Sequence, residues 1–185
     1  MGFFTSKKNI NSVVTSALVY ENAKVKPIEI KMLFDKIGAV YDDVENQLTI
    51  MTINVEIMRY ALQKSNSKEI VNNVIESSYT RFYNSLRVGN EQLEQYHSII
   101  DNVKNKVTEI LFNTHKQLVS KSTLVFRLIV ELEDIPLPII DRITEQEFIL
   151  TIDNWFNQAK SVNDTYKIFD SPEEKEINAP IDFDF

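Results

Sequence analysis

SKEIVNNVIESSYTRFYNSLRVGNEQLEQYHSIIDNVKNKVTEILFNTHKQLVSK, the stretch of residues 67–121, decides the predicted fold of this chain. Apolar residues recur in it every three or four positions, first over residues 70–86 and then over residues 93–118. That spacing is the period of an amphipathic helix. Gly89 lies between the two runs, so the pattern predicts two helices joined by a short turn, an αα-hairpin. We expect its apolar faces to hold the flanking helices together.

The composition of the 185-residue chain also favours long helices. Hydrophobic residues make up 43%, enough for a sizeable core, and 3 Gly and 5 Pro are too few for a turn-rich β fold. The absence of cysteine rules out disulfides and thiolate metal sites and is compatible with the cytosol. No apolar run approaches the roughly 20 residues that span a bilayer. We therefore expect a cytoplasmic, mainly α protein without a membrane span.

Charge is distributed unevenly along the chain. The net charge of -7 combines +3 over residues 1–130 with -10 over residues 131–185. An acidic end repels phosphate backbones, so we expect no direct binding to nucleic acid. A protein partner with a basic or apolar groove fits this charge better. The richness in Asn, Ile and Lys points to an AT-rich genome of bacterial or phage origin.

Helical spacing predicts five to seven helices packed as an irregular bundle. The first covers residues 9–22, with Val14 and Leu18 on its buried face. Pro27 is expected to end this segment and to begin the next helical run, because a residue before proline avoids the helical region. That next run extends over residues 28–64.

Two segments are also compatible with strands. Residues 51–57 alternate apolar and polar side chains, and residues 126–133 are rich in β-forming residues. We favour helix for both, because each lies inside a longer pattern of helical period and no turn signal bounds it. The alternative is an α+β fold with a small sheet built from these two segments.

The clearest helix start in the sequence lies near residue 144. Thr144 and Glu147 have the spacing of a capping box, in which each side chain bonds an exposed backbone amide. Ile143 and Phe148 are placed as its hydrophobic staple, and residues 162–169 are expected to add a last turn or a short helix. The predicted helix buries Ile149, Ile152, Trp155, Phe156 and Ala159.

The end of the chain has a different character. We expect a helical domain over residues 1–169 and a disordered acidic tail over residues 170–185. The tail closes with alternating apolar and acidic residues, the predicted partner-binding set Ile181, Asp182, Phe183, Asp184 and Phe185. Phenylalanines supply rigid contact area, and carboxylates can meet basic residues on a pocket rim. These residues resemble the acidic, Phe-terminated tip of bacterial single-strand-binding proteins and the clamp-binding peptide of phage polymerases, which implies a protein partner.

The two histidines are the first candidates for chemistry. Glu94 and His97 form a Glu-x-x-His, the half-motif of di-iron bundles, but Phe112 stands three residues before His115, so the second half is missing. The sequence therefore predicts no metal and no other cofactor. A pocket between helices that uses Glu94, His97 and Asp101 remains a less favoured alternative.

No nucleophile elbow, P-loop, dinucleotide-binding or zinc-protease motif occurs in the sequence, which favours a protein without enzymatic activity. The leading hypothesis is a protein-binding adaptor, chaperone-like or regulatory protein that engages its partner through the C-terminal peptide. A helical structural or assembly protein is the alternative, and homo-oligomers are left open.

Overall fold

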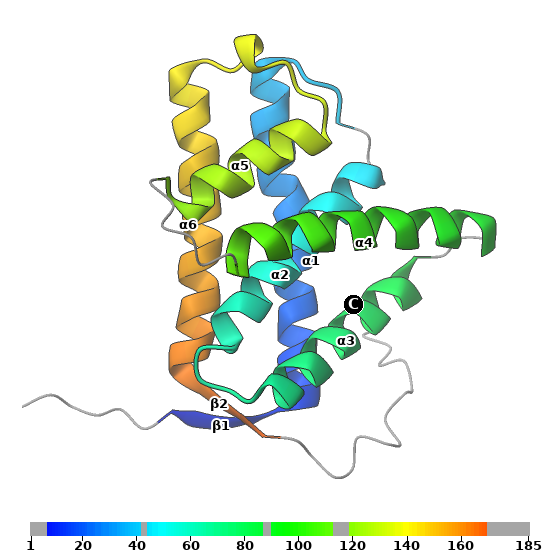
Figure 1. Cartoon of the computed structure of the whole chain (residues 1–185), viewed down its shortest axis with the longest axis vertical. Helices are drawn as coiled ribbons and strands as arrows, with labels where there is room; N and C mark the ends of the chain where they lie inside the picture. Colours follow the sequence, from blue (N-terminus) through cyan, green and yellow to red (C-terminus); the bar gives the residue numbers. More distant parts are fainter. Residues whose placement is uncertain (1–6, 42–43, 87–89, 113–118, 170–185) are drawn as a thin grey trace, which may run out of the picture.

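A computed structural model describes residues 7–41, 44–86, 90–112 and 119–169 (Figure 1). These residues form the helices α1 (Ser12–Ile37), α2 (Glu45–Leu62), α3 (Lys68–Ser85), α4 (Asn90–Phe112), α5 (Lys121–Leu132) and α6 (Arg142–Thr165), the 3-10 helix η1 (Leu137–Ile139), and the strands β1 (Lys8–Asn11) and β2 (Tyr166–Phe169). The predicted mainly α bundle is confirmed. None of these helices is long and apolar enough to cross a membrane. The predicted tail, residues 170–185, lies outside the described residues.

Helix α2 is the centre of the bundle. It packs against α1, α3, α4, α5 and α6, and every residue from 48 to 58 is buried. Because α2 is covered on all sides, it also buries the polar residues Thr52, Asn54 and Glu56, and these produce the alternation that resembles a strand. The helix prediction for residues 51–57 is confirmed, and residues 126–132 lie in α5. The α+β alternative built on these two segments is wrong.

Helices α3 and α4 confirm the two predicted helices, but they do not pack closely along their length. They diverge from their adjacent ends (Figure 1), and α3 packs mainly against α1 while α4 packs mainly against α2. Near those ends, the Tyr83 ring of α3 stacks on the His97 ring of α4 with centroids 4.1 Å apart. The bundle is therefore organised around α2 rather than around this pair.

Helix α1 continues through Pro27, so the predicted break is wrong. Proline removes the hydrogen bond to the carbonyl of Ala23, at a cost of about 3 kcal/mol in a helix interior. Both residues are buried, and the neighbouring Lys26 is bonded to α6, so tertiary packing outweighs the lost bond. The helix starts at its N-cap Asn11, whose side chain accepts from a backbone amide. It ends at Gly38, whose φ of 66° is the left-handed conformation that glycine adopts easily.

The N-cap of helix α6 lies three residues before the predicted N-cap, Thr144. Asp141 is its N-cap, and the Asp141 carboxylate accepts a hydrogen bond from the Thr144 amide at 2.7 Å. That bond lowers the pKa of Asp141. Because Ile143 now lies inside the first turn and is exposed, the predicted staple between Ile143 and Phe148 does not form, although Phe148 is buried. An aspartate at the earlier position is the better N-cap, which explains the shift.

The two strands pair in parallel and join distant parts of the chain. Lys8 lies opposite Tyr166, and Asn11 lies opposite Phe169. The sequence predicted a last turn or a short helix over residues 162–169, so the strand is a correction. Two four-residue strands whose partners are so far apart leave little periodic signal in the sequence.

Candidate functional site

The residues that the sequence singled out are divided between the described and undescribed parts of the chain. The partner-binding peptide, residues 181–185, and His115 lie outside the described residues. Glu94, His97 and Asp101 all lie on α4, where Glu94 and His97 are exposed and Asp101 lines a cleft. Among the described residues, no group of three or more His, Asp or Glu side chains could hold a metal ion.

A cleft of about 240 Å³ lies between α3 and α4. Its lining mixes aromatic, acidic and basic side chains, namely Glu76, Tyr79, Thr80, Tyr83, Ile100, Asp101 and Lys104. The Lys104 Nζ lies 5.3 Å from the centroid of the Tyr79 ring. Burial and the Asp101 carboxylate raise the pKa of Tyr83, which keeps this phenol protonated at neutral pH. His97 stacks on Tyr83 and supports the wall of the cleft instead of lining it.

A fully buried carboxylate, Glu56 of α2, lies behind this cleft. Tyr79 donates its hydroxyl hydrogen to Glu56 Oε1 at 2.9 Å, and Arg59 Nε lies 3.2 Å from Glu56 Oε2. Burial raises the pKa of Glu56, while Arg59 and the Tyr79 hydrogen bond oppose that rise. Because these partners enclose Glu56, it cannot meet a substrate. We interpret it as a polar junction between α2 and α3.

Glu56 belongs to a polar stripe that our sequence analysis missed. Thr49, Thr52, Glu56 and Arg59 recur at intervals of three and four residues, so they share one face of α2. The spacing was available in the sequence, but the apolar residues on the other faces of the helix dominate the pattern. Thr52 is buried, and its hydroxyl oxygen has no hydrogen-bond partner among the residues that the structure describes.

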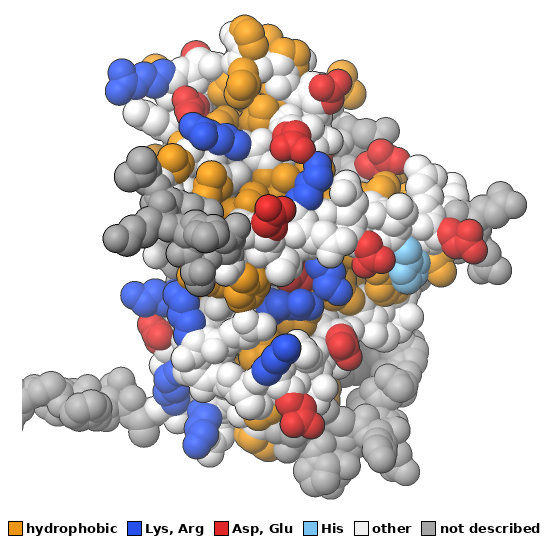
Figure 2. Space-filling model, viewed as in Figure 1, with side chains coloured by type: hydrophobic (Ala, Val, Ile, Leu, Met, Phe, Trp, Pro, Cys, Tyr) orange, Lys and Arg blue, Asp and Glu red, His pale blue; other side chains and the backbone are white. Residues whose placement is uncertain are grey.

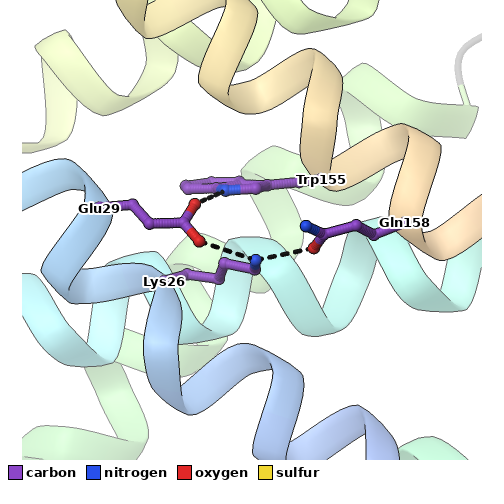
Figure 3. Close-up of polar contacts among 4 residues, drawn as sticks. All are labelled: Lys26, Glu29, Trp155 and Gln158. Carbon is purple, nitrogen blue, oxygen red and sulfur yellow. Dashed lines mark hydrogen bonds and ion pairs between the residues drawn. The ribbon is translucent and has the colours of Figure 1, made fainter.

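A buried lysine joins α1 to α6 (Figure 3). The Lys26 side chain is 2% exposed, and its Nζ donates to Glu29 Oε1 at 3.0 Å and to Gln158 Oε1 at 2.8 Å. Trp155 donates its indole hydrogen to the other oxygen of Glu29. With two acceptors around its ammonium group, Lys26 acts as a structural clamp between the helices.

The outward face of α1 carries a row of exposed apolar side chains, which we call the α1 ridge. Its members are Val14, Leu18, Val25, Ile28 and Met32, with exposed fractions of 51, 41, 47, 66 and 64%. At 100° per residue they fall within an arc of about 80°, and they extend over about 27 Å of helix. Glu21 occupies the position between Leu18 and Val25. With Glu21 included, the steps alternate between four and three residues, the spacing of a coiled-coil seam.

The α1 ridge overturns the predicted orientation of the first helix. The sequence predicts Val14 and Leu18 on the buried face. In the structure that face consists of Thr15, Ser16, Val19 and Ala23 in the first half of α1 and of Lys26, Pro27, Ile30, Leu33 and Phe34 further along the helix. Small side chains let α1 approach its neighbours closely. The ridge residues lie on the opposite side of the helix and are exposed to solvent.

The face of the molecule that α4 and α5 cover has a different surface. Figure 2 shows acidic, basic and apolar side chains interspersed across it. Helix α1 lies behind α2 and α4 in this view (Figure 1), and the ridge residues are on the side of α1 opposite to its buried face. The regular apolar row is thus a property of the α1 side of the bundle.

Comparisons with protein-family models, with curated protein sequences and with solved structures find no match to this chain.

Proposed function

We propose that this chain is a non-enzymatic protein-binding domain of the adaptor, chaperone-like or regulatory kind, and that it docks its partner along the α1 ridge. The observation that carries the proposal is the alignment of five exposed apolar side chains on one helix face. Contiguous exposed apolar surface on a soluble domain is a mark of a protein-binding site. A seam with coiled-coil spacing is suited to a second helix.

The ionisable groups in the core favour this function over the enzymatic alternative. Glu56 and Lys26 are both buried, and each is bonded to protein side chains from a neighbouring element. Such groups hold helices together and leave no face for a substrate. The hypothetical pocket of Glu94, His97 and Asp101 has only Asp101 in the cleft lining.

Site-specific photo-crosslinking tests the proposal. A photoreactive residue placed at Ile28 is expected to give discrete protein adducts in cells that make the chain at low level. The matched control is the same residue at Asn73, an exposed position on α3. Equal adduct patterns at both positions would count against a binding surface on α1.

The C-terminal peptide, residues 181–185, is a second candidate contact. The pairing of β2 with β1 fixes the chain at Phe169, so the peptide is tethered to the helical domain at a defined point. From that point, residues 170–180 reach at most about 38 Å. Deleting residues 182–185 is expected to weaken capture of a partner while leaving the helical circular-dichroism signal and the melting temperature unchanged. An unaltered set of captured partners would remove this contact from the proposal.

A further inference from the structure

We propose that the occupant of the α1 ridge is a second copy of this chain, bound with its α1 antiparallel to the first. This inference rests on the proposed function, because it names the partner that the ridge binds. The result is a symmetric dimer in which the same patch is used by both copies.

The ridge is complementary to itself in size when the helices run antiparallel. In an antiparallel pair, the residue numbers of two facing positions always add up to the same value. If that value is 46, every ridge position faces either another ridge position or Glu21 of the second copy. Val14 then faces Met32 of the second copy, and Leu18 faces Ile28. The shortest ridge side chain meets the longest one, so the seam can close without a large gap.

The same register places opposite charges together. Glu21 faces Val25 of the second copy and lies beside Lys24 of that copy. Within one chain, Glu21 Oε2 lies 3.8 Å from Lys24 Nζ, and the side chains of Glu21 and Lys24 are 61 and 57% exposed. Both can therefore turn towards a neighbouring helix at little cost. By symmetry each Glu21 lies between two lysines, which forms a four-charge cluster at the centre of the interface.

Charge also selects the orientation. In a parallel pair in register, Glu21 would meet Glu21 of the second copy inside the seam, and like charges at such a position are unfavourable. The antiparallel pair avoids this contact.

The tail of this chain fits the ridge less well than a second copy does. Ile181, Phe183 and Phe185 alternate with acidic residues at a period of two, whereas the ridge has a helical period. The acidic residues of the tail would also approach Glu21. A tail-covered ridge is nevertheless a distinct outcome that truncation at residue 169 can reveal.

The ridge is one helix wide, so it buries less than the roughly 800 Å² per partner of a standard interface. We therefore expect a reversible dimer with a dissociation constant in the micromolar range. Sedimentation velocity of the full chain, from micromolar to millimolar concentration, should show a shift from monomer to dimer. A monomer across that whole range overturns the inference.

Substitutions on the surface test which residues carry the dimer. Ile28→Glu places a carboxylate against Leu18 in two symmetric positions and is expected to weaken the dimer at least about 100-fold. The matched control is Leu137→Glu in η1, because Leu137 is 64% exposed and lies outside the ridge. Equal dimer constants for Ile28→Glu and the wild type overturn the inference.

A charge swap tests the register. Glu21→Lys and Lys24→Glu are each expected to weaken the dimer roughly 2- to 20-fold, since each single change creates like-charge neighbours twice. The double variant Glu21→Lys with Lys24→Glu is expected to recover the wild-type constant within about threefold. If the double variant loses as much dimer affinity as the two single variants together, the predicted register is wrong.

Disulfide formation tests the orientation directly, because the sequence has no cysteine of its own. A mixture of the single variants Val14→Cys and Met32→Cys is expected to form the mixed disulfide, since these positions face each other in the antiparallel pair. Val14→Cys alone should not crosslink, because its two copies would lie about 27 Å apart. Rapid crosslinking of Val14→Cys alone indicates a parallel pair and overturns the proposed arrangement.

Two further results separate this inference from the proposed function. A monomeric chain whose Ile28 crosslinks to a different protein overturns the dimer but leaves the protein-binding function standing. A dimer that appears only after residues 170–185 are removed makes the tail the occupant of the ridge in the full chain, which also overturns the inference.

Discussion

Glu29 of α1 accepts the indole hydrogen of Trp155 of α6 at a distance of 2.6 Å. The other carboxylate oxygen of Glu29 takes a hydrogen bond from the buried ammonium group of Lys26 (Figure 3). One carboxylate of α1 thus connects the Trp155 ring of α6 to the Lys26 cation of its own helix. The connection lies beside Pro27, where the backbone of α1 lacks a hydrogen bond. We infer that it stabilises α1 at the position where the helix lacks this backbone bond.

Replacing Lys26 separates the charge of this clamp from its packing. Lys26→Ala is expected to lower the free energy of unfolding by about 3 kcal/mol, because Gln158 and Glu29 lose their donor and the lysine stem leaves a cavity. Lys26→Met keeps most of the volume and should cost only about 1 kcal/mol. Urea unfolding followed by fluorescence measures both, and Trp155 is the single tryptophan of the chain. Equal losses in the two variants would show that packing of the stem contributes little.

Pro27→Ala tests whether tertiary packing alone carries the helix through the proline. The new amide can bond the carbonyl of Ala23, so the variant should gain helix stability. Greater freedom of the unfolded chain offsets part of this gain, and the net stabilisation should be about 1–2 kcal/mol. A rise in melting temperature measures it. A variant less stable than the wild type would show that the proline ring itself is required by the packing around it.

The helices could be predicted from the sequence, but the orientation of α1 could not. This helix has two faces with helical spacing, and each of them carries large apolar side chains, Ile30 and Phe34 on the buried face and Ile28 and Met32 on the exposed one. Val14 and Leu18 satisfy the period of a buried face, whereas the true buried face includes Thr15, Ser16 and the charged Lys26. Only the positions of the neighbouring helices decide between two such faces. For the same reason, the candidate binding surface could not be located before the structure was known.

The central role of α2 was hidden by a different effect. Its buried polar residues, among them Thr52 and Glu56, interrupt the apolar pattern that sequence reasoning relies on. The hydrogen bond that stabilises Glu56 comes from Tyr79, in another helix. Such pairings depend on long-range contacts, so local spacing predicts that α2 is a helix without predicting that it is surrounded.

Thr52→Val is expected to stabilise the bundle. The Thr52 hydroxyl is buried and finds no hydrogen-bond partner within the described part of the chain, and a methyl group of similar size removes the cost of its desolvation. The gain in the free energy of unfolding should be about 1 kcal/mol. Thr151→Val serves as the control, because the Thr151 hydroxyl donates to the carbonyl of Glu147 at 2.9 Å and its loss brings no such gain. A destabilised Thr52→Val variant would imply that a water molecule satisfies this hydroxyl.

The buried Glu56 predicts how stability depends on pH. Its pKa is raised in the folded chain above the ordinary value of 4.5, so between these two values the folded state binds more protons than the unfolded state. The free energy of unfolding should therefore fall as pH increases through this window, by about 1.4 kcal/mol for each pH unit that the window spans. Glu56→Gln does not titrate at this position. The free energy of unfolding of Glu56→Gln minus that of the wild type should therefore rise from pH 4.5 upward and become constant above the pKa of Glu56 in the folded chain.

Arg59 has no anionic partner at position 56 in Glu56→Gln at any pH, so its loss adds no slope to the stability curve of the variant. The slope and not the absolute stability therefore tests the prediction. Tyr79→Phe provides the second measurement. It removes a hydrogen bond that lowers the pKa of Glu56, so the pH window should extend to higher pH, with an added loss of about 1–2 kcal/mol. Urea unfolding of the three proteins between pH 4 and pH 8 gives the curves. Parallel curves for the wild type and Glu56→Gln would mean that Glu56 titrates in the folded chain as it does in the unfolded one.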